Sequence, residues 1–161
     1  MPPQDKHLEG DFAALIAPGL QLAFDERQDV PIDGYTLLGE KASRTIPVCG
    51  PASFLVLKAL AFKNLSEPKD AYDLIYVLRR WPAGIPNIAE RLTIHHGRYP
   101  EIVQAALAAL AADFADVESI GPLRAASFDG ESGEDLDALA ADAHGYVDDL
   151  LRACRQQCLC D

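Results

Sequence analysis

The hydrophobic positions in the second two thirds of the chain recur with the spacing of amphipathic helices. Pro51 suits the first turn of a helix over about 52–64, because proline is tolerated there and the following leucines, alanines and lysines favour helix. The segment SEPKDAYDL opens a second helix, with Ser66 as its cap and Pro68 in its first turn, which stops before Pro82. Three more helices are predicted: 86–96 ending at Gly97, 101–114, and one from SGEDLD (132–137) to Cys154.

The first fifty residues follow another pattern, with short stretches rich in β-formers. These stretches are 20–24, 34–38 and 44–49, and the turn-like segments DERQDVPIDG and GEKAS separate them. They predict an antiparallel β-meander over 18–50, followed by a helical portion over 51–161 with a flexible connection near 121–133. We therefore predict a single α+β domain over 1–161, in which a short β-meander precedes a helical bundle.

Composition narrows the class of protein. The 161 residues are 49% hydrophobic, which allows one core without disulfides or metals. A formal net charge of −11 argues against bulk DNA or RNA binding but leaves a local phosphate pocket open. No apolar run approaches the roughly 20 residues that span a bilayer, and the N-terminus lacks the order of a signal peptide. We expect a soluble, cytoplasmic protein with reduced cysteines.

Lys58 stands out because the helix around it, FLVLKALAF, is otherwise apolar on every side. An interior ammonium needs a negative partner, since burying it alone costs several kcal/mol. Asp70 and Asp73 share one flank of the next helix, which the short connection NLSE folds back against the first. We expect Lys58 to pair with one of them, mainly Asp73, with Asp70 more open to solvent. The pair either pins a helical hairpin or lines a cleft for a phosphorylated ligand.

The segment PASFLVLKALAFKNLSEPKDAYDLIYVL (51–78) resembles the C-terminal signature of bacterial nucleotidyltransferase-like proteins of the AbiEii/AbiGii abortive-infection toxin group. In that group a helix with a lysine precedes a helix that starts with a basic residue, Asp-x-x-Asp and leucine. The resemblance implies that Lys58 contacts nucleotide phosphates and that Asp70 is the functional acid, with Asp73 and Lys69 supporting them. It also implies a nucleoside triphosphate and Mg²⁺ as cofactors, and a nucleotidyltransferase-like sheet before the helical bundle.

The front half of that pattern is missing from residues 1–50, which contain neither a Gly-Ser or Gly-Gly turn nor an Asp-x-Asp pair. Such a pair holds the divalent metal in this kind of phosphoryl transfer. We therefore predict a nucleotidyltransferase-related domain that is incomplete or inactive alone, whose partner is an antitoxin or a complementing chain. The alternative is a non-catalytic interaction or oligomerisation module of a toxin–antitoxin system, with a homo-oligomer among its forms.

The remaining candidates favour structural roles. His95 and His96 suit a helix C-terminus, and Asp135 and Asp137 read as the acidic first turn of a helix capped by Ser132. Asp25, at the end of a predicted strand, would be a further sheet carboxylate. We predict no metal site: Cys154, Cys158 and Cys160 lack a good fourth ligand, because only the distant Cys49 or His144 offers one. Tyr72 and Tyr76 are predicted to lie in the core or at an interface rim.

Overall fold

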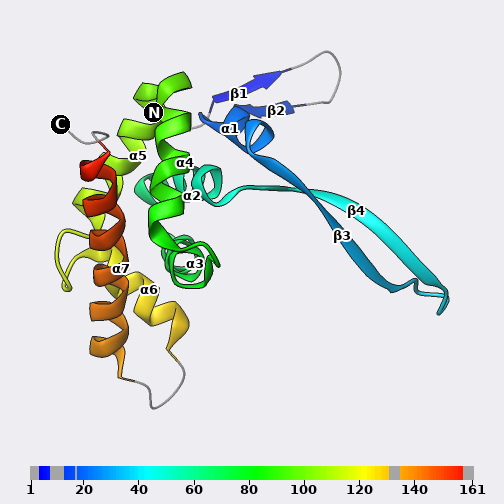
Figure 1. Cartoon of the computed structure of the whole chain (residues 1–161). Coiled ribbons are helices and arrows are strands. Elements are labelled where there is room, and N and C mark those ends of the chain that lie inside the picture. Colours follow the sequence, from blue (N-terminus) through cyan, green and yellow to red (C-terminus); the bar gives the residue numbers. More distant parts are fainter. Residues whose placement is uncertain (1–3, 8–12, 17, 131–134, 158–161) are drawn as a thin grey trace.

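The computed structural model describes residues 4–7, 13–16, 18–130 and 135–157 (Figure 1). Over these ranges the chain forms seven helices and two separate two-stranded antiparallel hairpins. The predicted α+β class, with a short β segment before a helical bundle, is confirmed. The strands are β1 (Gln4–His7), β2 (Ala13–Ile16), β3 (Arg27–Tyr35) and β4 (Lys41–Cys49); the helices are α1 (Leu20–Asp25), α2 (Pro51–Leu65), α3 (Pro68–Arg80), α4 (Gly84–Arg98), α5 (Pro100–Asp113), α6 (Ile120–Asp129) and α7 (Leu136–Gln156).

The helices pack around one apolar core, to which every helix contributes. Helix α2 packs against α3 and α5, α6 lies between α3 and α7, and α4 packs against α7. The largest side chains buried there include Leu22, Leu55, Phe62, Leu74, Ile88, Leu92 and Leu150. In the described part of the chain, no helix has the length and apolar character needed to cross a membrane.

The predicted helices agree well with the structure where proline marks their first turn. Pro51 and Pro68 occupy the first turns of α2 and α3, as expected. The assignment of Ser66 was wrong, because it ends α2 with a left-handed φ of 53° while Glu67 is the cap position of α3. Helix α4 runs beyond the predicted stop at Gly97 to Arg98. Asp135, not Ser132, caps α7 through its own side chain, and Ser132 lies outside the described residues.

The predicted three-stranded meander is instead a short helix followed by a hairpin. Residues 20–24 form α1, because a Pro-Gly turn ending at Gly19 (φ 87°) starts the helix and Leu22 is completely buried in the helical core. The turn-like segment 25–34 is mostly strand β3, which pairs with β4 along its whole length, from Arg27 opposite Cys49 to Tyr35 opposite Lys41. Tertiary packing overrides local strand propensity in α1.

The predicted flexible connection at 121–133 was also wrong over most of its length. Helix α6 covers Ile120–Asp129, and Gly121 and Pro122 are buried in its first turn. Gly121 lies directly against the Phe114 ring, where a methyl group would overlap that ring. The close approach explains why this helix begins with residues that usually mark a loop. Residues 131–134 lie outside the described part of the chain.

Candidate functional site

Lys58 lies between two carboxylates supplied by the next helix. It is near the middle of α2, and its Nζ is 2.7 Å from Asp70 Oδ1 and 2.7 Å from Asp73 Oδ2, both on α3. The ammonium also lies 5.7 Å from the centroid of the Phe54 ring, at cation–π distance. The predicted pairing of Lys58 with an aspartate of the following helix is confirmed, and it involves both aspartates at once.

The expectation that Asp73 is the deeper and principal partner is wrong. The Asp70 side chain is 15% exposed, whereas those of Asp73 and Lys58 are each 23% exposed. Two carboxylates three positions apart share a flank of α3, so one long lysine side chain can place its ammonium between them. Helix α3 packs on α2, and Asp70, in the first turn of α3, is the less exposed of the two aspartates.

The three charges hold Lys58 in its ionised form. Partial burial alone would lower the pKa of Lys58, but the hydrogen bonds and negative charges of Asp70 and Asp73 outweigh it and raise that pKa above its usual 10.5. One cation and two anions give the group a formal charge of −1, and two of the three ammonium donors are used. Lys69, the other predicted supporting residue, has an exposed side chain on α3.

The carboxylates of this group fit a magnesium ion only together with a ligand. Magnesium is commonly held by one or two carboxylates, with water and substrate phosphates completing its shell. Asp70 and Asp73 supply two carboxylates side by side. Among the described residues, no group of three or more His, Cys, Asp and Glu side chains is arranged to hold a metal. A magnesium ion at Asp70 and Asp73 would therefore need the phosphates of a bound nucleotide to complete its coordination shell.

A second polar cluster, which the sequence did not reveal, joins the hairpin to the helices. Glu26 Oε2 accepts hydrogen bonds from the Ser53 amide and hydroxyl, both at 2.7 Å, and lies 3.1 Å from His95 Nε2. Its other oxygen, Oε1, is 3.1 Å from Arg91 Nη1. Burial would raise the pKa of Glu26, but the hydrogen bonds from His95, Ser53 and Arg91 prevail and lower it to about 2. Glu26 is therefore an ionised carboxylate, with a side chain only 10% exposed, that holds the base of the hairpin against α2 and α4.

Serine, histidine and glutamate together suggest a hydrolytic triad, but the geometry favours a structural role, in which these residues hold the helices together. Ser53 is completely buried in the first turn of α2, and its hydroxyl is 2.8 Å from the Leu22 carbonyl and 2.7 Å from Glu26. A nucleophile needs access to substrate, which this hydroxyl lacks. Glu26 instead satisfies an amide at the start of α2, a position where negative charge is favoured. His95 lies in the last turn of α4, as predicted, but it serves this buried cluster.

Asp25 is not a sheet carboxylate. It ends α1, accepts a hydrogen bond from the Tyr99 hydroxyl at 2.7 Å and lies 3.1 Å from Arg98 Nη1. A small hollow of about 210 Å³ lies between these groups, lined by Asp25, Glu26, Arg91, Ile94, His95 and Arg98. Both guanidinium groups that line it already face carboxylates. We therefore assign this region to holding α1 against α4.

The other predicted candidates take structural positions where they are described. Cys154 is completely buried in the core, and Cys158 and Cys160 lie outside the described residues. His144 Nδ1 is 3.0 Å from the Phe114 carbonyl, at hydrogen-bond distance. The Tyr72 ring lies between those of Tyr76 and Phe128, with centroids 6.0 and 5.0 Å away, and Tyr76 is 52% exposed, so Tyr76 does not lie in the core.

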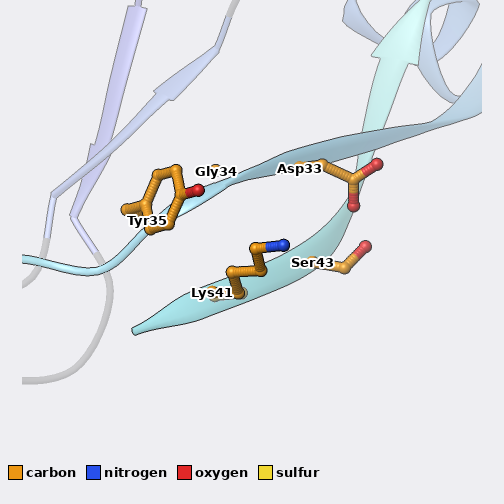
Figure 2. Close-up of a pocket in the computed structure, with 6 residues that line it drawn as sticks. Asp33, Gly34, Tyr35, Lys41 and Ser43 are labelled. Atoms are coloured by element: carbon orange, nitrogen blue, oxygen red, sulfur yellow. The ribbon is translucent and has the colours of Figure 1, made fainter. Parts of the chain in front are cut away.

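A larger hollow, of about 430 Å³, lies far from Lys58, near the tip of the β3–β4 hairpin. Asp33, Tyr35, Lys41 and Ser43 line it from both strands, and Figure 2 shows their side chains together on one face. The Tyr35 side chain is 72% exposed, so the hollow is an open part of the surface. Comparison of the chain with protein-family models, with curated proteins and with solved structures gives no match.

Proposed function

We propose that this chain is a nucleotidyltransferase-related domain of the AbiEii/AbiGii toxin type that is incomplete alone. In this proposal Lys58 contacts the phosphates of a nucleotide, and Asp70, with Asp73 beside it, faces the same ligand. The supporting observation is that Lys58 Nζ lies 2.7 Å from both carboxylates at a place still open to solvent on each of the three side chains. A ligand needs this partial exposure to reach the ammonium.

The charge of the group sets what it can bind. Its formal charge of −1 disfavours a free phosphate, whereas a magnesium-bound nucleotide brings positive charge to the two carboxylates. The metal, when bound, supplies charge neutralisation at the phosphates. Lys58 keeps one donor for a phosphate oxygen, and Asp70 and Asp73 orient the ammonium. Since residues 1–50 lack an Asp-x-Asp pair, we expect no efficient transfer by this chain alone.

Binding of a magnesium nucleotide tests the proposal directly. Calorimetry with Mg²⁺ and a nucleoside triphosphate should give binding to the natural chain, weakened at least about tenfold by Lys58→Met, a loss of about 1.4 kcal/mol. Lys63→Met is the matched control, because Lys63 is exposed on the same helix. Unchanged affinity in Lys58→Met, or no binding at millimolar nucleotide, would refute the proposal.

A labelling assay tests the expected lack of transfer. The purified chain is incubated with labelled nucleoside triphosphates, Mg²⁺ or Mn²⁺, and bulk transfer RNA or protein. We expect trace labelling only. Metal-dependent labelling above that level, abolished in Asp70→Ala, would show that the site is complete.

A second function, as an interaction module, is favoured by the β3–β4 hairpin. The two strands project away from the helices (Figure 1), and seven of the nine residues of β4 and all nine of β3 are exposed. Such a projection is available to another protein chain, as an interaction or oligomerisation module of a toxin-type system in the bacterial cytoplasm requires. Both functions can coexist, because Lys58 lies on α2 and not on the hairpin.

A further inference from the structure

The β3–β4 hairpin, residues 27–49, differs in charge from the rest of the molecule. It carries three basic residues (Arg27, Lys41 and Arg44) and three acidic residues (Asp29, Asp33 and Glu40), so its formal charge is zero. The whole net charge of −11 therefore belongs to the rest of the chain. A neutral hairpin can approach an acidic surface without the repulsion that two acidic bodies experience.

Both edges of the hairpin are protected against further strand pairing. Thr36 N donates to Glu40 O at one end of the ladder, and Gly50 N donates to Glu26 O at the other. Because hydrogen-bonded pairs alternate along an antiparallel ladder, even-numbered residues direct their amides inward and odd-numbered residues direct theirs outward. Pro31 and Pro47 therefore lie at outward positions, one on each edge. Proline donates no hydrogen bond, so added strands are disfavoured there.

The two faces of the hairpin differ in polarity. The same alternation places Val30, Ile32, Ile46 and Val48 on one face, with exposed fractions between 38% and 49%. The opposite face carries the odd-numbered residues, including those around the hollow in Figure 2. A second hollow, of about 300 Å³, is lined by residues that include Ile32, Ala42, Arg44 and Ile46 of the apolar face. This apolar face is suited to packing flat against the surface of another protein.

We propose that a second copy of this chain covers the apolar face, through reciprocal exchange of the two hairpins. Each hairpin lies on the helices of the other copy. Arg44 is the one charged residue among the even-numbered positions of the two strands, and the acidic helical body of a second copy complements it. This inference goes beyond the proposed function and does not depend on nucleotide binding.

The helices offer an apolar surface to receive the hairpin. Leu123 and Phe128 on α6, Tyr76 on α3 and Leu136 at the start of α7 are each between 49% and 52% exposed. Helix α6 packs against both α3 and α7, so these side chains come from three helices that pack on one another. We call these four residues the α6 patch. Large apolar side chains left exposed on neighbouring helices offer apolar area for such a contact.

The buried area distinguishes exchange from simple stacking of two hairpins. Nine residues at about 3.3 Å each make a face roughly 30 Å long and roughly 10 Å wide, or about 300 Å². Two hairpins stacked on each other bury about 600 Å² in total, below the roughly 1,000 Å² expected of a specific interface. Reciprocal packing of each hairpin on the other body buries about 1,200 Å², which reaches that range.

Analytical ultracentrifugation of the full chain tests the proposal. We expect a dimer at 100 µM protein, with Ile46→Asp raising the dissociation constant at least about tenfold. Thr45→Asp, one residue away on the polar face, is the matched control and should change it less than about twofold. Ile46 and Thr45 are both exposed on the hairpin, so neither substitution disturbs the core, and circular dichroism verifies folding.

Substitutions on the body separate exchange from stacking. Leu123→Asp should weaken the dimer as Ile46→Asp does, because exchange places the hairpin on the α6 patch, whereas stacking of two hairpins leaves Leu123 outside the contact. A monomeric natural chain, an intact Ile46→Asp dimer, or a Leu123→Asp dimer of unchanged affinity would each overturn the proposal. A monomeric chain that still binds magnesium nucleotide would overturn the exchange and leave the proposed function standing.

Discussion

Replacing Lys58 by methionine should cost about 2–3 kcal/mol of unfolding free energy. The substitution removes an ammonium 2.7 Å from each of two carboxylates and leaves Asp70 and Asp73 facing each other as like charges. Exposed ion pairs contribute about 0–1 kcal/mol, and breaking a buried pair costs about 3–5 kcal/mol. The exposed fractions of 15% to 23% place this group between those limits. Asp70→Asn and Asp73→Asn each lose only one contact and should cost less, about 1–2 kcal/mol.

Urea unfolding of the variants measures these costs. The triple variant Lys58→Met, Asp70→Leu, Asp73→Leu removes every charge of the group, and it should recover to within about 1 kcal/mol of the natural chain. Lys63→Met, on the exposed part of the same helix, should change stability by less than about 0.5 kcal/mol. A Lys58→Met cost as small as that of the control would refute the reasoning. So would a triple variant less stable than the single one.

The Lys58 group also predicts how the stability of the chain changes at alkaline pH. The pKa of Lys58 is raised above 10.5 in the folded chain, so its contribution is complete below pH 10.5 and disappears as the pH rises through the folded value. The stability difference between the natural chain and Lys58→Met should therefore be constant near neutral pH and shrink above pH 10.5. A difference that grows with alkaline pH would contradict the assigned partners.

Two further predictions concern Glu26. The pKa of Glu26 falls from 4.5 to about 2 on folding, so Glu26 should contribute up to about 3 kcal/mol of unfolding free energy above pH 4.5, and this contribution should disappear as the pH falls toward 2. Urea unfolding at several pH values measures this loss. Glu26→Gln should reduce the fall in stability at acid pH, whereas Glu67→Gln, an exposed control, should not. Gly50→Ala should destabilise the chain by about 2–3 kcal/mol in thermal or urea unfolding, because its methyl group would overlap Glu26. Gly97→Ala, with nothing near the added methyl group, should be neutral or slightly stabilising, and equal costs for the two would contradict this view.

The parts of the fold that could be predicted are those whose causes are close in sequence. Pro51 and Pro68 mark the starts of α2 and α3 within one turn, and the helical period shows which faces are apolar. Lys58 and Asp70 are only 12 residues apart, on helices joined by a short connection, so their pairing follows from helix geometry. Which aspartate is more buried depends on how α3 docks on α2, and the sequence does not contain that detail.

The missed features depend on partners far along the chain. Glu26 meets Ser53 across 27 residues and His95 across 69 residues, and no spacing rule connects them. The strand-like segment 20–24 becomes helical because Leu22 enters a core formed by later helices. In both cases a long-range contact overrides the local signal. Helix α6 was missed for a more local reason, since Gly121 indicates a loop until the Phe114 ring, seven residues before it, is placed against it.

The Glu26 cluster also bears on whether the hairpin and the Lys58 group influence each other. Glu26 directly precedes β3 and Gly50 directly follows β4, and Gly50 N donates to Glu26 O at 2.7 Å, so both ends of the hairpin are fixed at one point. That point also begins α2, the helix that carries Lys58. Coupling between two sites requires an element with two arrangements. A carboxylate that is only 10% exposed and is held by Ser53, His95 and Arg91 has one favourable arrangement, which fixes the base of the hairpin. A substitution on the hairpin should therefore not reach Lys58 within one chain. Measured at a concentration where the chain is monomeric, Ile46→Asp should bind nucleotide as the natural chain does.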